Sequence, residues 1–282
     1  MPINLFYQIG TPIELRDNHN RRKQRIINIH NTPQIHHQEH FMRKVIFITG
    51  LTRMYKGFVC ISGIDTETGK FVRPIIHYPE RLGIKKEFLF NNQKLIIKPL
   101  VKVELDFLQA EPKSDFHTED WQINPTVKPK LISIPSEDEK KKILENHLDK
   151  SVDNALHDQS RSLIIVKPQQ VPLVNLSIRE DRLRTHLTFR DLSGGLQPHM
   201  PVTDANWLAI TRWLWMKHKG NKKRTEDNLR FFLRSKNIYL RIGVTREFQG
   251  QKWRQISGVF SFPDWLLGRS FLDYNYDFDD HV

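Results

Sequence analysis

The sequence predicts a mainly β protein with some α-helix, built as two small β-barrels with intervening helices. Short apolar runs rich in Val, Ile and Phe cluster in both halves of the chain. A proline-containing stretch and one helical segment separate the two clusters. An eight-residue phrase that joins two strand-like runs also occurs once in each half.

The repeated phrase reads Gly-Leu-Thr-Arg-Met-Tyr-Lys-Gly at residues 50–57 and Gly-Val-Thr-Arg-Glu-Phe-Gln-Gly at residues 243–250. Each copy follows an apolar run and precedes a second run that carries Ile-Ser-Gly. A polar turn that is closed by glycine between two strands predicts a β-hairpin. Two interpretations stay open: one hairpin design used twice, or two unrelated hairpins with similar turn chemistry.

In the first half, strand signals cover residues 45–50, 58–65, 70–76 and 100–107. The segment Thr-Glu-Thr-Gly at residues 66–69 supplies a hairpin turn, and residues 100–107 alternate apolar and polar side chains like a strand with one wet face. Four strands within about seventy residues favour a small barrel over half of a sandwich.

Residues 124–135 contain three prolines and predict a linker. A helix should follow, because Ser136 and Glu139 match a capping box. Strand signals resume at residues 162–167, 171–178 and 182–189, and the chain ends with strands at 239–245 and 253–262. Between them we expect a helix capped by Thr203 or Asp204 and another capped near Thr225, with their aromatic residues in the core.

These signals divide the chain into five parts. Residues 1–42 form a disordered or mis-called N-terminal extension, rich in His, Asn and Gln, with Met42 as the natural start. Residues 43–135 form the first barrel, 136–160 a helical linker, 161–272 the second barrel with a helical insertion, and 273–282 an acidic tail.

Composition points to a polyanionic partner. The chain has 44 Lys and Arg against 32 Asp and Glu, a net charge of +12, which favours nucleic acid over a merely soluble basic protein. The single cysteine, Cys60, excludes a disulfide framework and a cysteine-rich zinc module. No run of eighteen apolar residues and no signal peptide is visible, so we expect a cytoplasmic protein with no membrane partner.

Several short phrases resemble the dual OB-containing domain family of bacterial proteins. They are Ile-Thr-Gly-Leu-Thr-Arg at residues 48–53, Cys-Ile-Ser-Gly-Ile-Asp at 60–65, Gly-Lys-Phe-Val-Arg-Pro-Ile at 69–75, and the segments 239–246 and 257–263. The resemblance covers about residues 43–270 and implies two OB-type barrels and nucleic-acid binding.

One departure from a simple tandem copy is visible. The first copy of the repeated phrase opens a barrel, whereas about two strands follow the second copy. The second barrel must therefore draw on strands that begin near Ser162. The repeat then reflects permuted or merely convergent hairpins.

OB barrels bind single strands through a basic groove and through aromatic rings that stack on bases. We therefore expect binding residues in the repeated turn and on the strands nearby. The candidates are Arg53, Tyr55 and Lys56 in the first turn, Arg246 and Phe248 in the second, Phe71 and Arg73 on one strand face, and Arg254. The alternative for Phe71 is a core position.

Positive charge is concentrated between Arg212 and Arg254, where thirteen Lys or Arg face three Asp or Glu. Lys222, Lys223 and Arg224 fall in a predicted loop between the two helices of the insertion. Such a cluster fits a phosphate-contacting patch, and a solvated charge run is the alternative.

No specific catalytic, metal-binding or cofactor-binding pattern is present in the sequence. We therefore expect a nucleic-acid-binding module without its own catalysis, and the resemblance implies a sensor or adaptor in a bacterial defence or regulatory system, with an unidentified protein partner. The alternative is an enzyme that acts on RNA or nucleotides, with Asp65, Glu67 and His77 converging at a barrel mouth.

Truncation to residues 42–282 should leave folding intact, because residues 1–41 have no amphipathic period that could supply core contacts. The melting temperature of the truncated protein, measured by calorimetry, should match that of the full chain. A drop of about ten degrees would show that the extension is a structural element.

Overall fold

The computed structural model describes residues 42–79, 81–111, 116–157, 160–179, 182–247 and 250–275. The expected N-terminal extension, most of the acidic tail and the candidate Phe248 lie outside these residues. Within them, no helix combines the length and the apolar composition that a membrane crossing requires.

The first half of the chain forms a seven-stranded sheet in the order β1-β2-β4-β3-β8-β7-β9. Additional pairings of β1 with β7 and of β2 with β3 close five of these strands into a ring, β1-β2-β3-β8-β7. The ring is antiparallel except for the β3–β8 pair. A two-stranded sheet, β5 with β6, lies between β4 and β7 in the sequence. The bounds are β1 (Met42–Arg53), β2 (Phe58–Asp65), β3 (Phe71–Tyr78), β4 (Arg81–Lys85), β5 (Phe90–Asn91), β6 (Lys94–Leu95), β7 (Lys102–Ala110), β8 (Asp120–Ile123) and β9 (Lys130–Ser133).

The long strand β1 makes the closure possible, because its two halves pair with different neighbours. Its first half pairs with β7, where Ile46 lies opposite Val103. Its second half pairs with β2, where Leu51 lies opposite Ile61. All four side chains are buried, and they belong to the core of this barrel.

The second half repeats this topology. A sheet β10-β11-β15-β16 and a sheet β12-β13-β14 are joined by a parallel bridge between Val202 and Ile256. Strand β11 pairs with β15 and β12 pairs with β13, as the two halves of β1 pair with β7 and β2. The bounds are β10 (Leu148–Asp149), β11 (Leu163–Val166), β12 (Leu173–Arg179), β13 (Arg182–Arg190), β14 (Leu196–Pro201), β15 (Asn237–Val244) and β16 (Arg254–Phe262).

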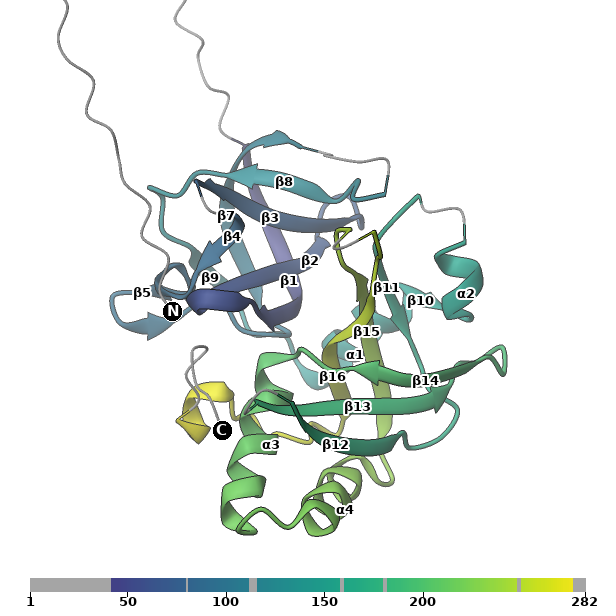
Figure 1. Cartoon of the computed structure of the whole chain (residues 1–282). Coiled ribbons are helices and arrows are strands. Elements are labelled where there is room, and N and C mark those ends of the chain that lie inside the picture. The colour runs from purple at the N-terminus through teal and green to yellow at the C-terminus, as the bar shows by residue number, and fades with distance from the viewer. Residues whose placement is uncertain are drawn as a thin grey trace, which may run out of the picture. The chain divides into compact units, whose positions relative to one another are not determined.

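Each ring therefore has the five-stranded Greek-key order of an OB barrel, with β11 and β12 together as the first strand of the second barrel. The predicted fold class, mainly β with two OB-like barrels and intervening helices, is confirmed (Figure 1). The residue boundaries that we expect for the domains and the linker stay a prediction.

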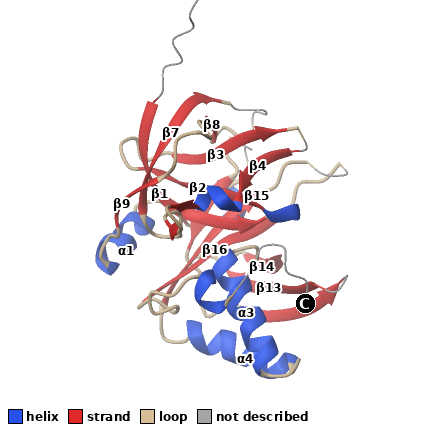
Figure 2. Ribbon diagram, turned by 90° about the vertical axis from the view of Figure 1, so that its left-hand side faces the viewer, coloured by secondary structure: helices blue, strands red, loops and turns tan. Residues whose placement is uncertain are grey.

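The described residues also include the helices α1 (Glu137–Glu145), α2 (Val152–Ala155), α3 (Ala205–Lys217) and α4 (Lys222–Leu233), with the short 3-10 helices η1 (Tyr55–Gly57), η2 (Lys86–Leu89) and η3 (Phe271–Tyr274). The caps predicted at Ser136 and Asp204 are present, since their side chains accept bonds from the amides of Glu139 and Trp207. Helices α3 and α4 lie together beside the β12–β14 sheet (Figure 2).

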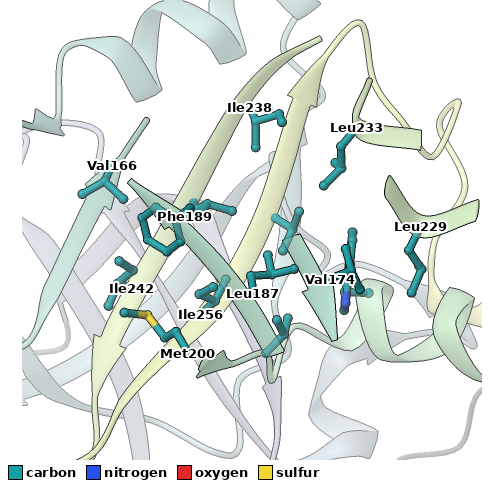
Figure 3. Close-up of a cluster of buried hydrophobic side chains, with 14 of the residues drawn as sticks. Val166, Val174, Leu187, Phe189, Met200, Leu229, Leu233, Ile238, Ile242 and Ile256 are labelled. Atoms are coloured by element: carbon teal, nitrogen blue, oxygen red, sulfur yellow. The ribbon is translucent and has the colours of Figure 1, made fainter. Parts of the chain in front are cut away.

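Helices α3 and α4 close the core of the second barrel. Leu229 and Leu233 of α4 pack with Val174 and Leu187 of the sheet (Figure 3). The expectation that helical aromatic residues fill the core is confirmed for Trp207, which is fully buried and donates its indole N–H to Thr185 Oγ1 at 3.0 Å. It is wrong for Trp213 of α3 and Phe231 of α4, whose side chains are exposed.

The repeated phrase falls on two hairpins that are not equivalent. Strands β1 and β2 are the first and second strands of their barrel, whereas β15 and β16 are the fourth and fifth strands of theirs. Both hairpins carry a register shift beside the Ser-Gly pair, Ser62-Gly63 in one and Ser257-Gly258 in the other. The extra residue is Thr49 on β1 in one hairpin and Ser257 on β16 in the other, so the two phrases are not tandem copies.

The two hairpins pack against each other and join the barrels. Phe47 and Ile64 of the first barrel form one buried cluster with side chains of α1, β11, β15 and β16, namely Leu144, Ile165, Tyr239, Phe260 and Phe262. The backbones approach closely, because a Cβ at Gly258 would lie 2.8 Å from the carbonyl oxygen of Thr49. The outer face of β1 and β2 is consequently covered.

Replacement of Gly258 by Ala should reduce the free energy of unfolding by about 3 kcal/mol, because the added methyl would meet both the Thr49 carbonyl and the Phe260 ring. Denaturant titration gives the value. The control is Gly194→Ala, where no atom lies within 4 Å and a φ of +89° limits the loss to about 1 kcal/mol of backbone strain. Equal losses in the two variants would contradict the close approach of the hairpins.

Candidate nucleic-acid interface

The outer face of β12, β13 and β14 is the main candidate surface. On β13 the odd-numbered Thr185, Leu187 and Phe189 are buried, so the even-numbered side chains point away from the core. Opposing pairs such as Ser177 with Arg184 continue this face across β12. Figure 1 shows the three strands side by side.

The charged side chains of these strands all have the same sign. Together they contain four arginines, two histidines and no Asp or Glu. We call the set the basic face: Arg179, Arg182, Arg184, His186, Arg190 and His199. An acid-free stripe of arginines is the electrostatic footprint that a phosphate backbone requires.

Two imidazole rings meet on the basic face. His186 and His199 lie with ring centroids 6.4 Å apart in an edge-on arrangement. His199 has a left-handed φ of +46°, and its amide N–H donates to Thr188 Oγ1 at 3.0 Å. Burial lowers the pKa of His186, with smaller contributions from His199 and Arg184, so its ring is neutral at pH 7 and suited to stacking.

The predicted loop cluster Lys222, Lys223 and Arg224 is the first turn of α4, which corrects the predicted helix start near Thr225. Asn221 caps the helix by accepting from the Arg224 amide. All three cationic side chains are exposed, as predicted for a patch or a solvated run.

The α4 turn borders the basic face. Glu226 Oε1 accepts from the amide of Leu176 on β12 at 2.7 Å, and Lys222 Nζ lies 3.9 Å from the same oxygen. The cations of α4 therefore continue the surface of β12 beyond its edge.

The candidate residues of the two repeated turns lie in different environments. Lys56 is exposed in η1, Arg53 is half-buried at the end of β1, and nothing is described of the Tyr55 side chain. Arg246 donates to Asp120 Oδ2, and Arg254 donates to Asp153 of α2. These two arginines thus hold acidic side chains in this structure.

Phe71 and Arg73 do not form the expected shared groove. The side chain of Arg73 is 7% exposed, and its guanidinium donates to Asp120 Oδ1 at 3.0 Å and to Ser162 Oγ. Phe71 is half-buried and lines a cleft beside α1. Burial in an ion pair keeps Arg73 from contacting a nucleic acid in this structure, so we leave it out of the interface.

Arg73 belongs to a buried polar network at the joint of the barrels. Asp120 bridges Arg73 and Arg246, and Glu119 accepts from the amides of Ser162 and Leu163 at 2.7 and 3.1 Å. His117 adds a contact between its Nε2 and the carbonyl oxygen of Val244 at 3.2 Å. The network connects β3 and β8 with β11 and β15.

The three residues of the enzyme alternative do not converge. Asp65 is the last residue of β2, beside the start of β3, and it is buried in an ion pair with Lys44 at 2.8 Å. His77 lies near the other end of β3, where it contacts Glu111. Six residues of strand separate these ends by about 20 Å. Among the described residues, no group of three or more His, Cys, Asp or Glu has a metal-binding arrangement.

Sequence reasoning missed the basic face. Its signal was present, because the alternating segment 182–189 places an arginine or a histidine at 182, 184 and 186. The face has no Phe, Tyr or Trp beside its arginines, since its rings are those of His186 and His199.

Comparison with known families gives a match over most of the chain. A family model described as the dual OB-containing domain matches residues 44–259. Among curated proteins, none matches the chain.

Acid should weaken the joint of the barrels through His117. Burial lowers the pKa of His117 to about 4, and the nearby Arg73 charge acts in the same direction. Between pH 6.5 and pH 4 the unfolded chain, whose histidine pKa is about 6.5, binds more protons than the folded chain. The contribution of His117 to the free energy of unfolding is therefore fully present above about pH 6.5 and is lost as the pH falls toward 4. Between pH 7.5 and 5 the free energy of unfolding should fall by about 2 kcal/mol.

The matched variant is His117→Gln, whose amide can still donate to the Val244 carbonyl but does not titrate. Urea titrations across this pH range should show a flatter profile for the variant than for the wild type. Parallel profiles would mean that His117 does not control the acid response.

Proposed function

Because the chain belongs to the dual OB-containing domain family, we propose that it binds single-stranded nucleic acid through the outer face of its second barrel. OB barrels bind oligonucleotides on the face of their second and third strands and with the loops beside them. In the second barrel these strands are β13 and β14.

The observation that carries the proposal is the acid-free composition of β12, β13 and β14. Arginine pairs with phosphate oxygens through a planar fork of donors, and it also stacks on bases. His186 and His199 add ring surfaces among the arginines. A polyanion thus meets no carboxylate within these strands, and the neighbouring carboxylates include Glu180 and Asp181, which connect β12 to β13 in the sequence, and Glu226 at the β12 edge.

The dimensions of the face suit a short single strand. The nine residues of β13 span about 30 Å. Binding sites of about 4 to 16 nucleotides per OB barrel are usual. The first turn of α4, with Lys222, Lys223 and Arg224, extends the surface past the β12 edge.

The first barrel has a different role in this proposal. Its β1–β2 face packs on β15 and β16, with Phe47 and Ile64 buried there. A strand cannot reach this face without separating the barrels. We therefore assign binding of the strand to the second barrel and support of that barrel to the first.

A module without its own catalysis is supported by the geometry of the enzyme alternative, because Asp65 and His77 lie near opposite ends of β3, about 20 Å apart. We propose that it works as a sensor or adaptor in a cytoplasmic bacterial defence or regulatory system. Its support is the family membership together with the charge of +12.

Replacement of Arg184 and Arg190 by Ala should weaken the binding of single-stranded oligonucleotides and reduce its salt dependence. Each lost phosphate contact removes about 0.7 from the slope of log affinity against log salt, so two contacts remove about 1.4. Fluorescence anisotropy with DNA and RNA 12-mers at several salt concentrations gives both quantities. The triple variant Lys222→Ala, Lys223→Ala and Arg224→Ala should lower the slope by roughly 2 if the α4 turn participates.

A matched control removes two exposed lysines from the first half, Lys128→Ala with Lys130→Ala, and should leave the slope unchanged. His186→Ala should lower affinity by about 1–3 kcal/mol without altering the slope, because stacking releases no counterions. If the Arg184 and Arg190 variant binds like the control, the basic face is only a solvated surface.

A further inference from the structure

A cleft of about 830 Å³ lies beside the first barrel, away from the strands of the basic face. One wall comes from β1, the β2–β3 turn, β3 and β8, and the other from the end of α1, β10 and Arg161. The volume falls within the range of small-molecule and cofactor sites.

Three rings line this cleft: Phe71, Trp121 and His147. The ring of His147 lies between two carbonyl oxygens, with its Nδ1 2.7 Å from that of Ile143 and its Nε2 3.0 Å from that of Gly69, and an N–H donated to one of them orients it. The ring of Phe71 packs edge-on against His147, with centroids 6.0 Å apart. The wall is thereby built before a ligand arrives.

The charges of the cleft are balanced, since Lys44, Lys70 and Arg161 line it together with three carboxylates, Asp65, Glu119 and Asp149. Lys44 pairs with Asp65 at 2.8 Å and also covers the Trp121 ring at 4.7 Å. Arg161 pairs with Asp149. Lys70 is exposed at the rim, and within the described part of the chain no ion pair involves its side chain. The arrangement suits an aromatic ligand with one negative group better than a long polyanion.

We infer that the cleft binds a single nucleotide, with the base against Phe71 and the phosphate at Lys70. The exposed side-chain amide of Asn146 stands at the same wall and offers hydrogen bonds to a base edge. The inference does not depend on the basic face, since none of the residues of that face lines the cleft. The nucleotide is either free or the terminal residue of a strand.

Calorimetric titration of the full chain with AMP and UMP, and with adenosine and uridine, tests the site. Phe71→Leu keeps apolar packing against α1 but removes the ring, and it should weaken nucleotide binding by about 10-fold. Lys70→Ala should weaken AMP and UMP by a similar factor and leave the nucleosides unaffected. The Arg184→Ala, Arg190→Ala variant is the control and should bind mononucleotides like the wild type.

Fluorescence anisotropy with a 5′-phosphorylated 12-mer distinguishes a free nucleotide from the terminal residue of a strand as the ligand. If Phe71→Leu weakens the 12-mer as well as AMP, the cleft holds the end of a strand, and if it weakens AMP alone, the ligand is a free nucleotide. No heat with either nucleotide at millimolar concentration, or equal affinities for wild type and a folded Phe71→Leu variant, would overturn the inference. Neither outcome would affect strand binding by the basic face, which the Arg184 and Arg190 variant reports.

Discussion

The carboxylate of Asp120 is the interaction on which the arrangement of the barrels depends. It is fully buried and accepts from Arg73 of the first barrel and Arg246 of the second. Removal of a partner from such a pair leaves an uncompensated buried charge, which is far more costly than the loss of a surface ion pair. Glu119, the neighbouring residue, accepts two amides at the start of β11. The orientation of β11 and β15 relative to the first barrel is therefore specified by polar groups as well as by apolar packing.

Because of this joint, the two barrels expose different faces although they have the same topology. The β1–β2 face of the first barrel is buried against β15 and β16, with Phe47 and Tyr239 at its centre. The corresponding strands of the second barrel, β12 and β13, keep their outer face in solvent. The two barrels therefore share a fold but expose different surfaces, and the exposed face of β12 and β13 is the one that carries arginines.

Much of the fold could be predicted because its signals are local. Alternation and β-branched runs located the strands, and the side chains of Ser136 and Asp204 located two helix starts. The start of α4 was missed because Asn221 precedes three cations, which oppose the helix dipole and read as a loop. The burial of Arg73 was not predictable, since its partners Asp120 and Ser162 lie 47 and 89 residues away along the chain. The exposure of the basic face could not be predicted from the sequence, because it follows from the order of the strands in the second barrel.

The bond between Glu226 and the Leu176 amide has a further consequence for the behaviour of the protein at high concentration. Strand β12 stands at the edge of its sheet, where free backbone amides offer a template for another chain. The Glu226 carboxylate occupies one of these donors in the middle of the strand, and Arg179 places a charge at its end. A second molecule that added a strand here would have to displace α4 and bring like charges together. Helix α4 therefore hinders edge-to-edge aggregation at β12 while the outer face of the sheet stays accessible.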